Sequence, residues 1–405
     1  MSFTSRWSDV YLSAGARAIS GCGDFLAATA LVLALQERGA GSGAVAAVMI
    51  AAAVPPVVLA RWTGRLADRV DSRLLLVGAG LAQAAVCVAL AYATDTGPIV
   101  ALIALLGAGL ALTQPTLGAL LPAMVRPVDL ARASAIGQTA NSIGLLLAPI
   151  AGGVLVGQFG LRVPLLVDAA SYLALVAAGL LIRTRRGTPA ESADAAPARE
   201  FRLRTDTLLL AVFVLIGAVI AAVSAVNVGE VFLVRGELHS SATVYGLLSA
   251  TWLGAMLIGA WLVTRRDLDD GTLGIALLVL LATSCLVVVG CAVVPAVGWL
   301  VPLFVIGGAG NGGENVAANV LIARRAHPDV RGRAYALYGA VTNGATVIGF
   351  VLGGAVLTVL PVRLTLAAAG GLALVIAAAL AVPMLRAAAA ARYERPERRA
   401  TQATA

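Results

Sequence analysis

Two acidic residues lie inside long apolar stretches, where charge is expensive. Asp24 falls within an apolar run over about 10–35, and Glu314 falls within another over about 298–322. An ionised side chain at the centre of a membrane-spanning helix costs roughly 2.5–3.5 kcal/mol on insertion scales. Each acid is therefore expected to be neutral, paired with a cation, or exposed to a water-filled cavity. Both are candidates for carrying a proton through the membrane.

The surroundings of Asp24 allow two interpretations. Arg17 precedes it by seven residues, which is two helical turns on the same face. An Arg17–Asp24 pair would hold the acid in a proton-coupling site. Alternatively, Asp24 makes a structural hydrogen bond to a neighbouring helix, and the sequence leaves both interpretations open.

Glu314 belongs to a polar stripe on one helical face, because asparagines share that face at steps of three and four residues. A stripe of this density is not expected to face lipid, so it lines a cavity or forms hydrogen bonds between helices. A sparser stripe lies in an earlier run. The candidate cavity-lining residues are Asn311, Asn315 and Asn319 in the first stripe, and Gln138 and Asn141 in the second.

The elements that must position these residues are membrane helices. The chain has 405 residues, of which 60% are hydrophobic and 12% charged, and its mean hydropathy is +0.93. Each apolar run is long enough to cross roughly 30 Å of hydrocarbon as a helix, and none alternates in polarity as barrel strands do. We expect an all-α membrane protein with twelve spans, at about 10–35, 43–61, 74–94, 98–121, 134–157, 162–182, 207–233, 243–264, 272–294, 298–322, 334–359 and 363–385.

An internal repeat divides these spans into two pseudo-symmetric bundles of six. Gly107-Ala108-Gly109 recurs 201 residues later as Gly308-Ala309-Gly310, and Gly152-Gly153 recurs as Gly353-Gly354. Duplicated helix bundles of this kind usually carry a substrate between their halves. The predicted domains are a bundle over 1–183, a linker over 184–206, a bundle over 207–386 and a basic tail over 387–405.

Charge placement predicts the topology. All 29 basic residues are arginines. With a cytoplasmic N-terminus, only Arg38, Arg162, Arg235 and Arg363 would face outward, so the positive-inside rule places both termini in the cytoplasm of a multi-pass cell-membrane protein. The basic C-terminal tail is interpreted as a topology anchor close to anionic lipid headgroups, and the net charge of +8 is not taken to mark a nucleic-acid partner. The four cysteines show no metal-ligand spacing and are interpreted as packing residues.

The segment 64–73 resembles the signature loop of the major facilitator superfamily, G-x-L-a-D-r-x-G-r-k. It departs from that pattern where Asp71 replaces the second glycine and Ser72 replaces a basic residue. The resemblance implies a loop that biases the conformational equilibrium, whereas the simpler alternative is a set of loop charges that fixes topology. The implied gating residues are Gly64, Arg65, Asp68, Arg69 and Arg73.

Three further segments are similar to the enterobactin-exporter-like branch of that superfamily. They are the Ser-x-x-Gly-Asp element at 20–24, the Leu-Pro-Ala-Met-Val segment at 121–125 with 130–135 after it, and the segment 327–333. This likeness implies a proton-driven exporter of drug-like or siderophore-like molecules.

The run over 134–157 contains a segment that resembles the antiporter motif of the superfamily, with Ala148 in place of a glycine. Pro149 removes a backbone hydrogen bond and bends the helix, while Gly152 and Gly153 permit close contact with a neighbour. A helix of this kind is a candidate gate.

These features favour a secondary active transporter that works by alternating access, uses the proton gradient in place of a cofactor and acts as a monomer on small molecules. A P-loop requires a lysine, which the chain lacks, and no nucleophile or metal motif indicates an enzyme. Two alternatives remain: a proton-coupled uptake symporter, and a passive permease subunit of a multi-chain pump.

Overall fold

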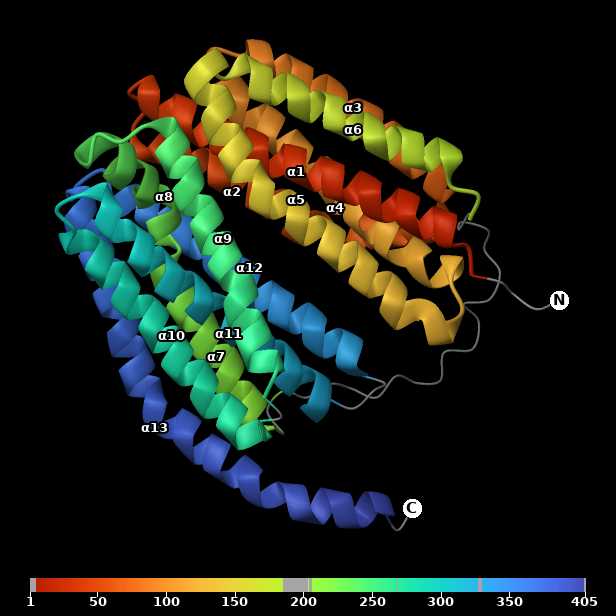
Figure 1. Cartoon of the computed structure of the whole chain (residues 1–405), viewed down its shortest axis with the longest axis vertical. Helices are drawn as coiled ribbons and strands as arrows, with labels where there is room; N and C mark the ends of the chain where they lie inside the picture. The colour runs from red at the N-terminus through yellow and green to blue at the C-terminus, as the bar shows by residue number, and fades with distance from the viewer. Residues whose placement is uncertain (1–4, 185–202, 204–205, 267, 327–329, 404–405) are drawn as a thin grey trace. The chain divides into compact units, whose positions relative to one another are not determined.

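A computed structural model describes residues 5–184, 203, 206–266, 268–326 and 330–403. Within these residues the chain is helical and has no strand (Figure 1). Its long helices are α1 (Trp7–Glu37), α2 (Ser42–Arg69), α3 (Ser72–Tyr92), α4 (Thr96–Met124), α5 (Leu130–Phe159), α6 (Arg162–Leu181), α7 (Thr207–Val223), α8 (Ala225–Val231), α9 (Ala242–Thr264), α10 (Asp270–Val293), α11 (Leu300–Arg325), α12 (Arg331–Val356) and α13 (Val362–Ala403). Short helical turns lie at Pro127–Asp129 (η1), Phe232–Glu237 (η3, a π-helix) and Val297–Trp299 (η4).

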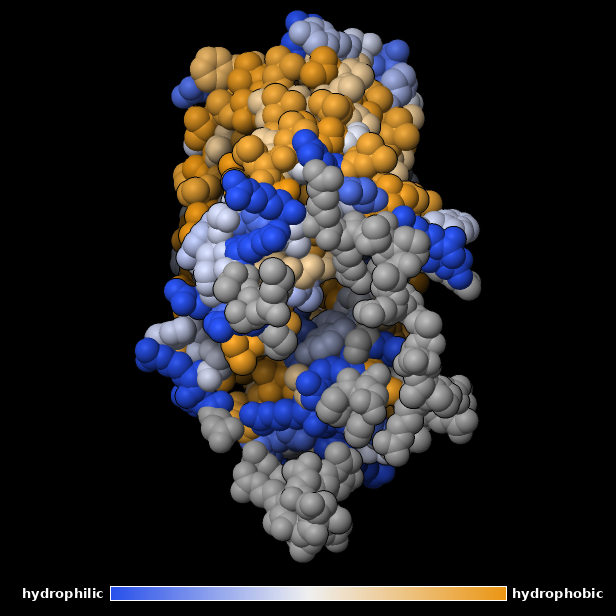
Figure 2. Space-filling view, turned by 90° about the vertical axis from the view of Figure 1, so that its right-hand side faces the viewer, coloured by the Kyte–Doolittle hydropathy of each residue, from blue (hydrophilic) through white to orange (hydrophobic). Residues whose placement is uncertain are grey.

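Most of these helices can cross a membrane. In the described part of the chain, 11 helical segments are long and apolar enough, and one of them, Thr207–Glu237, joins α7, α8 and the π-helix. The remaining long helix is α11, with 26 residues. Its polar stripe and glycines lower its hydropathy, which explains why twelve spans are expected from the sequence and 11 pass this criterion. Figure 2 shows the apolar side chains that such spans expose as a broad orange area.

The chain forms two compact units. The first comprises Met1–Asp194 together with Val234–Ala250, and the second comprises Ala195–Leu233 together with Thr251–Ala405. The predicted linker over 184–206 lies mostly outside the described residues, and the division falls inside it. The segment 234–250 was expected in the second bundle, yet it groups with the first unit. The reason is close packing of Gly246 on α9 against the carbonyl of Pro149 on α5.

The repeat seen in the sequence extends to helix packing within each unit. A Cβ atom on Gly107 of α4 would lie 3.4 Å from the carbonyl oxygen of Ala51 on α2. In the second unit, a Cβ atom on Gly308 of α11 would overlap the carbonyl oxygen of Trp252 on α9, which is the residue equivalent to Ala51. The two copies thus use glycine at the same positions to bring equivalent helices together.

A second equivalent pair fixes where α3 and α10 lie. Gly109 of α4 packs against the side chain of Gln83 on α3, and Gly310 of α11 packs against Ser284 on α10, again 201 residues later. Apolar side chains complete each core. In the first unit they come mainly from α1, α3, α4 and α6, and in the second from α7, α10, α11 and α13.

Two predicted boundaries are wrong. Helix α2 continues to Arg69, so the residues resembling the signature loop lie mostly on a helix rather than between helices. Helix α13 continues to Ala403, so the predicted tail over 387–405 is not a separate segment. Ala387, Ala388 and Ala391 are buried in the core of the second unit. The alanine run has high helix propensity and fits the close approach of Gly271 on α10 to α13.

The seventh predicted span, 207–233, is not one continuous helix. It breaks at Ser224 between α7 and α8 and then changes to the π-helix Phe232–Glu237. A Cβ atom on Gly349 of α12 would lie 2.8 Å from the carbonyl oxygen of Ala221, and one on Gly353 would lie 2.8 Å from the Cβ of Ala225. Helix α12 therefore packs tightly along both sides of the break.

Candidate functional site

A buried polar cluster lies in the first unit, where α1, α3 and α6 meet. Asp168 of α6 has only 1% of its surface exposed. Its Oδ2 accepts a hydrogen bond from the Cys87 thiol of α3 at 3.1 Å, and its Oδ1 accepts one from the Ser171 hydroxyl at 3.1 Å. Both partners of this carboxyl are neutral donors.

Asp24 of α1 faces the same turn of α6. Its Oδ1 accepts a hydrogen bond from the phenolic hydroxyl of Tyr172, whose side chain is fully buried. The preceding residue must be glycine, because a Cβ atom on Gly23 would overlap Asp168 Oδ1 and Ser171 Oγ. The Gly-Asp pair of the motif at 20–24 thus has a physical explanation. Gly23 leaves room for the carboxyl of Asp168, and Asp24 supplies the second carboxyl of the cluster.

Asp24 does not pair with Arg17 but makes a hydrogen bond to the neighbouring helix α6, which is the second of the two interpretations that the sequence leaves open. Among the described side chains no ion pair joins Arg17 to Asp24, and the buried Nε of Arg17 has no hydrogen-bond partner. Tyr172 occupies the partner position instead, because α6 brings its hydroxyl directly to the carboxyl. A separation of two turns along one helix, about 10 Å, is long for a direct pair.

Sequence reasoning missed the α6 and α3 members of this cluster. The position of Asp168, only six residues into its apolar run, favours an interfacial or structural role, and Cys87 is interpreted as a packing residue. A signal was nevertheless present. Ser171 and Tyr172 lie three and four residues after Asp168, and Cys87 lies four residues after Gln83, so both neighbours of Asp168 share its side of α6 and Gln83 and Cys87 share one face of α3.

The second unit contains the predicted stripe on α11. Asn311 donates from Nδ2 to Oε1 of Glu314 at 2.8 Å, and Oε2 of Glu314 is buried with no partner in the described part of the chain. Asn315 and Asn319 each donate to the backbone carbonyl four residues earlier, at 2.8 Å. Glu314 is 8% exposed, whereas Asn319 is exposed. The stripe therefore runs from a buried acid to an accessible amide.

The sparser stripe and the candidate gate both lie on α5. Gln138 is exposed, and Asn141 Oδ1 approaches Gly21 of α1. A Cβ atom on Gly152 would lie 3.1 Å from the carbonyl oxygen of Leu26 on α1, and one on Gly153 would lie 2.6 Å from that of Ala242 on α9. The two neighbouring glycines thus serve two different helix contacts within the first unit.

The residues resembling the signature loop lie at the end of α2 and the start of α3. Arg65 and Arg69 are exposed, while Gly64 and Arg73 are partly buried. Asp68 lies on α2, and its side chain is outside the described part of the structure. The acid that caps α3 is Asp71, whose Oδ1 accepts a hydrogen bond from the backbone N–H of Arg73 at 2.7 Å. The replacement of the second glycine by aspartate thus supplies a helix cap.

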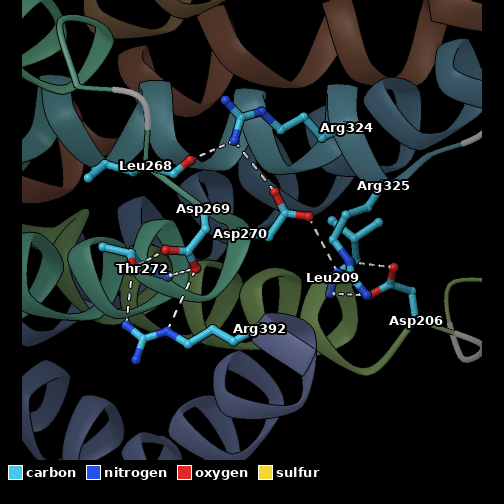
Figure 3. A network of polar contacts seen from close by, with 9 residues as sticks. All are labelled: Asp206, Leu209, Leu268, Asp269, Asp270, Thr272, Arg324, Arg325 and Arg392. Atoms are coloured by element: carbon cyan, nitrogen blue, oxygen red, sulfur yellow. Dashed lines mark hydrogen bonds and ion pairs between the residues drawn. The ribbon is translucent and has the colours of Figure 1, made fainter. Parts of the chain in front are cut away.

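The second unit has a polar network at the ends of four helices (Figure 3). Arg325 of α11 donates from Nε to Oδ2 of Asp206 at 2.7 Å, and its Nη1 lies 3.5 Å from Oδ2 of Asp270. Asp206 also caps α7 by accepting from the backbone N–H of Leu209. Since the Arg325 side chain is only 6% exposed, this network holds α7, α10 and α11 together away from solvent.

The same network reaches α13 through a helix cap. Asp269 caps α10 by accepting from the backbone N–H of Thr272 at 2.9 Å and from its hydroxyl at 2.5 Å. Arg392 of α13 donates to the Thr272 hydroxyl at 3.0 Å. The hydrogen bond from Thr272, with the charge of Arg392 as a smaller contribution, holds the pKa of Asp269 below its ordinary value.

The chemistry these sites allow is proton exchange and helix movement. Within the described residues no group of three histidine, cysteine or acidic side chains is placed to hold a metal ion. Asp24, Asp168 and Glu314 are acids held by neutral donors inside apolar helices. Such groups can accept and release protons, and the glycine contacts of α5 and α12 permit neighbouring helices to lie close together.

Comparison with known proteins identifies the family. The sequence profile of the Major Facilitator Superfamily matches residues 14–287 and 271–404. The multidrug resistance protein MdtG of Serratia proteamaculans is 27% identical over 300 residues, which cover 73% of this chain and 72% of that protein. MdtG of Yersinia enterocolitica is 27% identical over 304 residues, covering 74% and 73%.

Solved structures share the fold. A mutant of the nucleoside transporter NupG superimposes with a TM-score of 0.75 at 14% identity, over 93% of this chain and 99% of that one. A bacterial homologue of the iron transporter ferroportin gives a TM-score of 0.72 at 17% identity, over 95% and 100%. The predicted all-α fold and the assignment as a transporter rather than an enzyme are thereby confirmed, and the chain is a multi-pass membrane protein that belongs to the major facilitator superfamily.

Proposed function

We propose that the protein is a proton-coupled exporter of small drug-like or siderophore-like molecules that works by alternating access. The observation that carries this proposal is the acid within α1: Asp24 lies inside a membrane helix, and its hydrogen-bond donor is the neutral phenol of Tyr172. An acid without a cationic partner can bind a proton on one side of the membrane and release it on the other. Glu314 on α11 provides a second acid of this kind, with one carboxyl oxygen unpartnered.

The likeness to MdtG supports the direction and the substrate class. Those relatives are named as multidrug resistance proteins, and efflux of small apolar molecules agrees with the apolar character of the spans. The transporter takes its energy from the proton gradient and needs no cofactor. It acts as a monomer in the cell membrane, with both termini in the cytoplasm, as the placement of arginines indicates.

Transport by purified protein in lipid vesicles tests this function. The vesicles carry an imposed pH gradient and no ATP, and the lipophilic cation ethidium is the probe. We expect ethidium movement against the direction of proton flow. Movement of probe and protons in the same direction would indicate a symporter, and a requirement for ATP would indicate a subunit of a multi-chain pump.

Substitution of the two acids sharpens the test. Asp24→Asn and Glu314→Gln are expected to lose gradient-driven transport. The matched control is Asp95→Asn, because Asp95 precedes α4 at an exposed position and its side chain makes no cap hydrogen bond. Gradient-driven transport that stays at the wild-type rate in both acid variants would place proton coupling elsewhere in the chain.

A further inference from the structure

The turn of α6 that faces Asp24 carries a second buried carboxyl, Asp168. We propose that Asp168 is a proton-binding residue of the transport cycle and shares one coupling proton with Asp24. This inference rests on the proposed proton coupling and extends it to a residue on α6.

The geometry places the two carboxyl groups on facing turns. Asp168 Oδ1 packs against Gly23, the residue next to Asp24. The two lie so close that a Cβ atom at position 23 would overlap this oxygen. Asp24 in turn accepts a hydrogen bond from Tyr172, one helical turn beyond Asp168. The carboxyls thus share α6 as a common source of hydroxyl donors.

Among the described residues, the titratable groups that face this pair are thiols and not cations. From α3 the pair meets the thiol of Cys87, which donates to Asp168, and from α1 it meets the thiol of Cys22, whereas Arg17 lies two turns away along α1. Helix α4 contains no charged residue, and the single charged residue of α5, Arg132, lies over the ring of Trp7. Two ionised carboxylates here would repel each other without compensation, so a shared proton is the arrangement that balances the site.

A further polar group marks this face of α3. Gln83 lies one helical turn before Cys87 and is only 2% exposed, and neither its Oε1 nor its Nε2 has a hydrogen-bond partner among the residues that the structure describes. A buried amide with two unsatisfied atoms is rare and costly. Its position one turn from Cys87 extends the polar face of α3 beyond the contact with Asp168.

The expected step is a proton transfer with no change in covalent bonds. A proton arriving from one side protonates a carboxylate of the pair, and the hydrogen bonds from Cys87, Ser171 and Tyr172 hold the remaining negative charge. Release to the other side leaves both carboxylates ionised, and their mutual repulsion favours capture of the next proton. The pair therefore binds and releases one proton in each cycle.

The experiment measures ethidium transport in vesicles against pH for the wild type, Asp168→Asn, Asp24→Asn and the double variant. We expect each single variant to lose at least about tenfold in gradient-driven rate, and the double variant to be no slower than either single variant. Exchange of ethidium without a gradient should remain in all of them. Gradient-driven transport by Asp168→Asn with the pH profile of the wild type would overturn the proposal.

Two variants keep the test independent of how well Asp168→Asn folds. Cys87→Val and Ser171→Ala each remove one donor to Asp168 while its carboxyl stays in place. A displaced midpoint of the pH profile supports the proposal, and an unchanged midpoint in both contradicts it. Cys291→Val is the matched control, because Cys291 is a buried thiol in the second unit. If the wild type itself shows no gradient dependence, the proposed function fails. If only Asp168→Asn behaves as the wild type, the inference fails alone.

Discussion

Tyr172 of α6 donates its phenolic hydrogen to the carboxyl of Asp24 on α1, so an acid inside the membrane is held by a neutral partner. The contact joins residues 148 positions apart in the chain. It also replaces the pair with Arg17 that the spacing within α1 suggests. The polar centre of the first unit is consequently organised by α6, a helix whose sequence shows an ordinary apolar run with one acid near its start.

Tyr172→Phe should destabilise the protein while keeping the ring in the core. A buried acid that loses a hydrogen-bond donor typically costs about 1–3 kcal/mol. Thermal unfolding of the protein in detergent would show this as a lower midpoint. Tyr11→Phe is the control, since Tyr11 is 54% exposed. Equal midpoints for the two variants would mean that the Tyr172 hydroxyl does not stabilise Asp24.

Gly23→Ala should be strongly disfavoured. The added methyl group would overlap Asp168 Oδ1 and Ser171 Oγ, so these side chains must leave their hydrogen-bonded positions or α1 and α6 must move apart. Overpacking of this kind usually costs about 1–3 kcal/mol. Gly15→Ala on the same helix is the matched control, because a Cβ atom there meets nothing within 4 Å. In the control, the higher helix propensity of alanine should leave stability unchanged or slightly increased. A thermal midpoint for Gly23→Ala as high as that of Gly15→Ala would show that α1 and α6 are not packed as described.

Much of the fold could be predicted because apolar runs and short loops determine where membrane helices begin and end. The predicted ends of α3 and α6 lie within two residues of the structure. The extension of α2 to Arg69 was missed because its last turns are charged, and helix formation there depends on local hydrogen bonds rather than on apolar length. The break at Ser224 lies in a uniformly apolar segment, where hydropathy carries no information about helix continuity.

The candidate site was harder to predict because it depends on which helices meet. Glu314 and its asparagines share one helix, so their relationship could be read from spacing alone. Asp24 and Asp168 come from different helices, and only packing shows that they face each other. The glycine at position 23 is the clearest sequence sign of such a contact, although its spacing does not reveal which helix approaches.

Arg325→Ala should cost more stability than any exposed arginine substitution in the same region. Its side chain is 6% exposed and lies between Asp206 and Asp270, so its removal takes the cation from Asp206 and, among the described residues, leaves Asp270 with only the exposed Arg324. Breaking a buried ion pair in this way typically costs about 3–5 kcal/mol.

Arg324→Ala is the control. That side chain is 37% exposed and lies 3.6 Å from Asp270, and exposed pairs contribute only about 0–1 kcal/mol. Chemical denaturation of both variants in detergent would compare them. Similar losses would contradict the idea that burial makes Arg325 the more important residue.

The cap of α10 should make stability depend on pH in the acid range. The pKa of Asp269 is lowered in the folded protein, mainly by the hydrogen bond from the Thr272 hydroxyl. A group whose folded pKa is depressed contributes stability above its unfolded pKa of 3.8, and that contribution disappears as the pH falls through the folded pKa.

Asp269→Asn should therefore lower the thermal midpoint at pH 7, and the difference from the wild type should shrink as the pH drops below 3.8. Thr272→Val should show a smaller effect of the same sign, because the backbone N–H of residue 272 still reaches Asp269. A difference between wild type and Asp269→Asn that stays constant down to the lowest pH would exclude the ionised cap as its source.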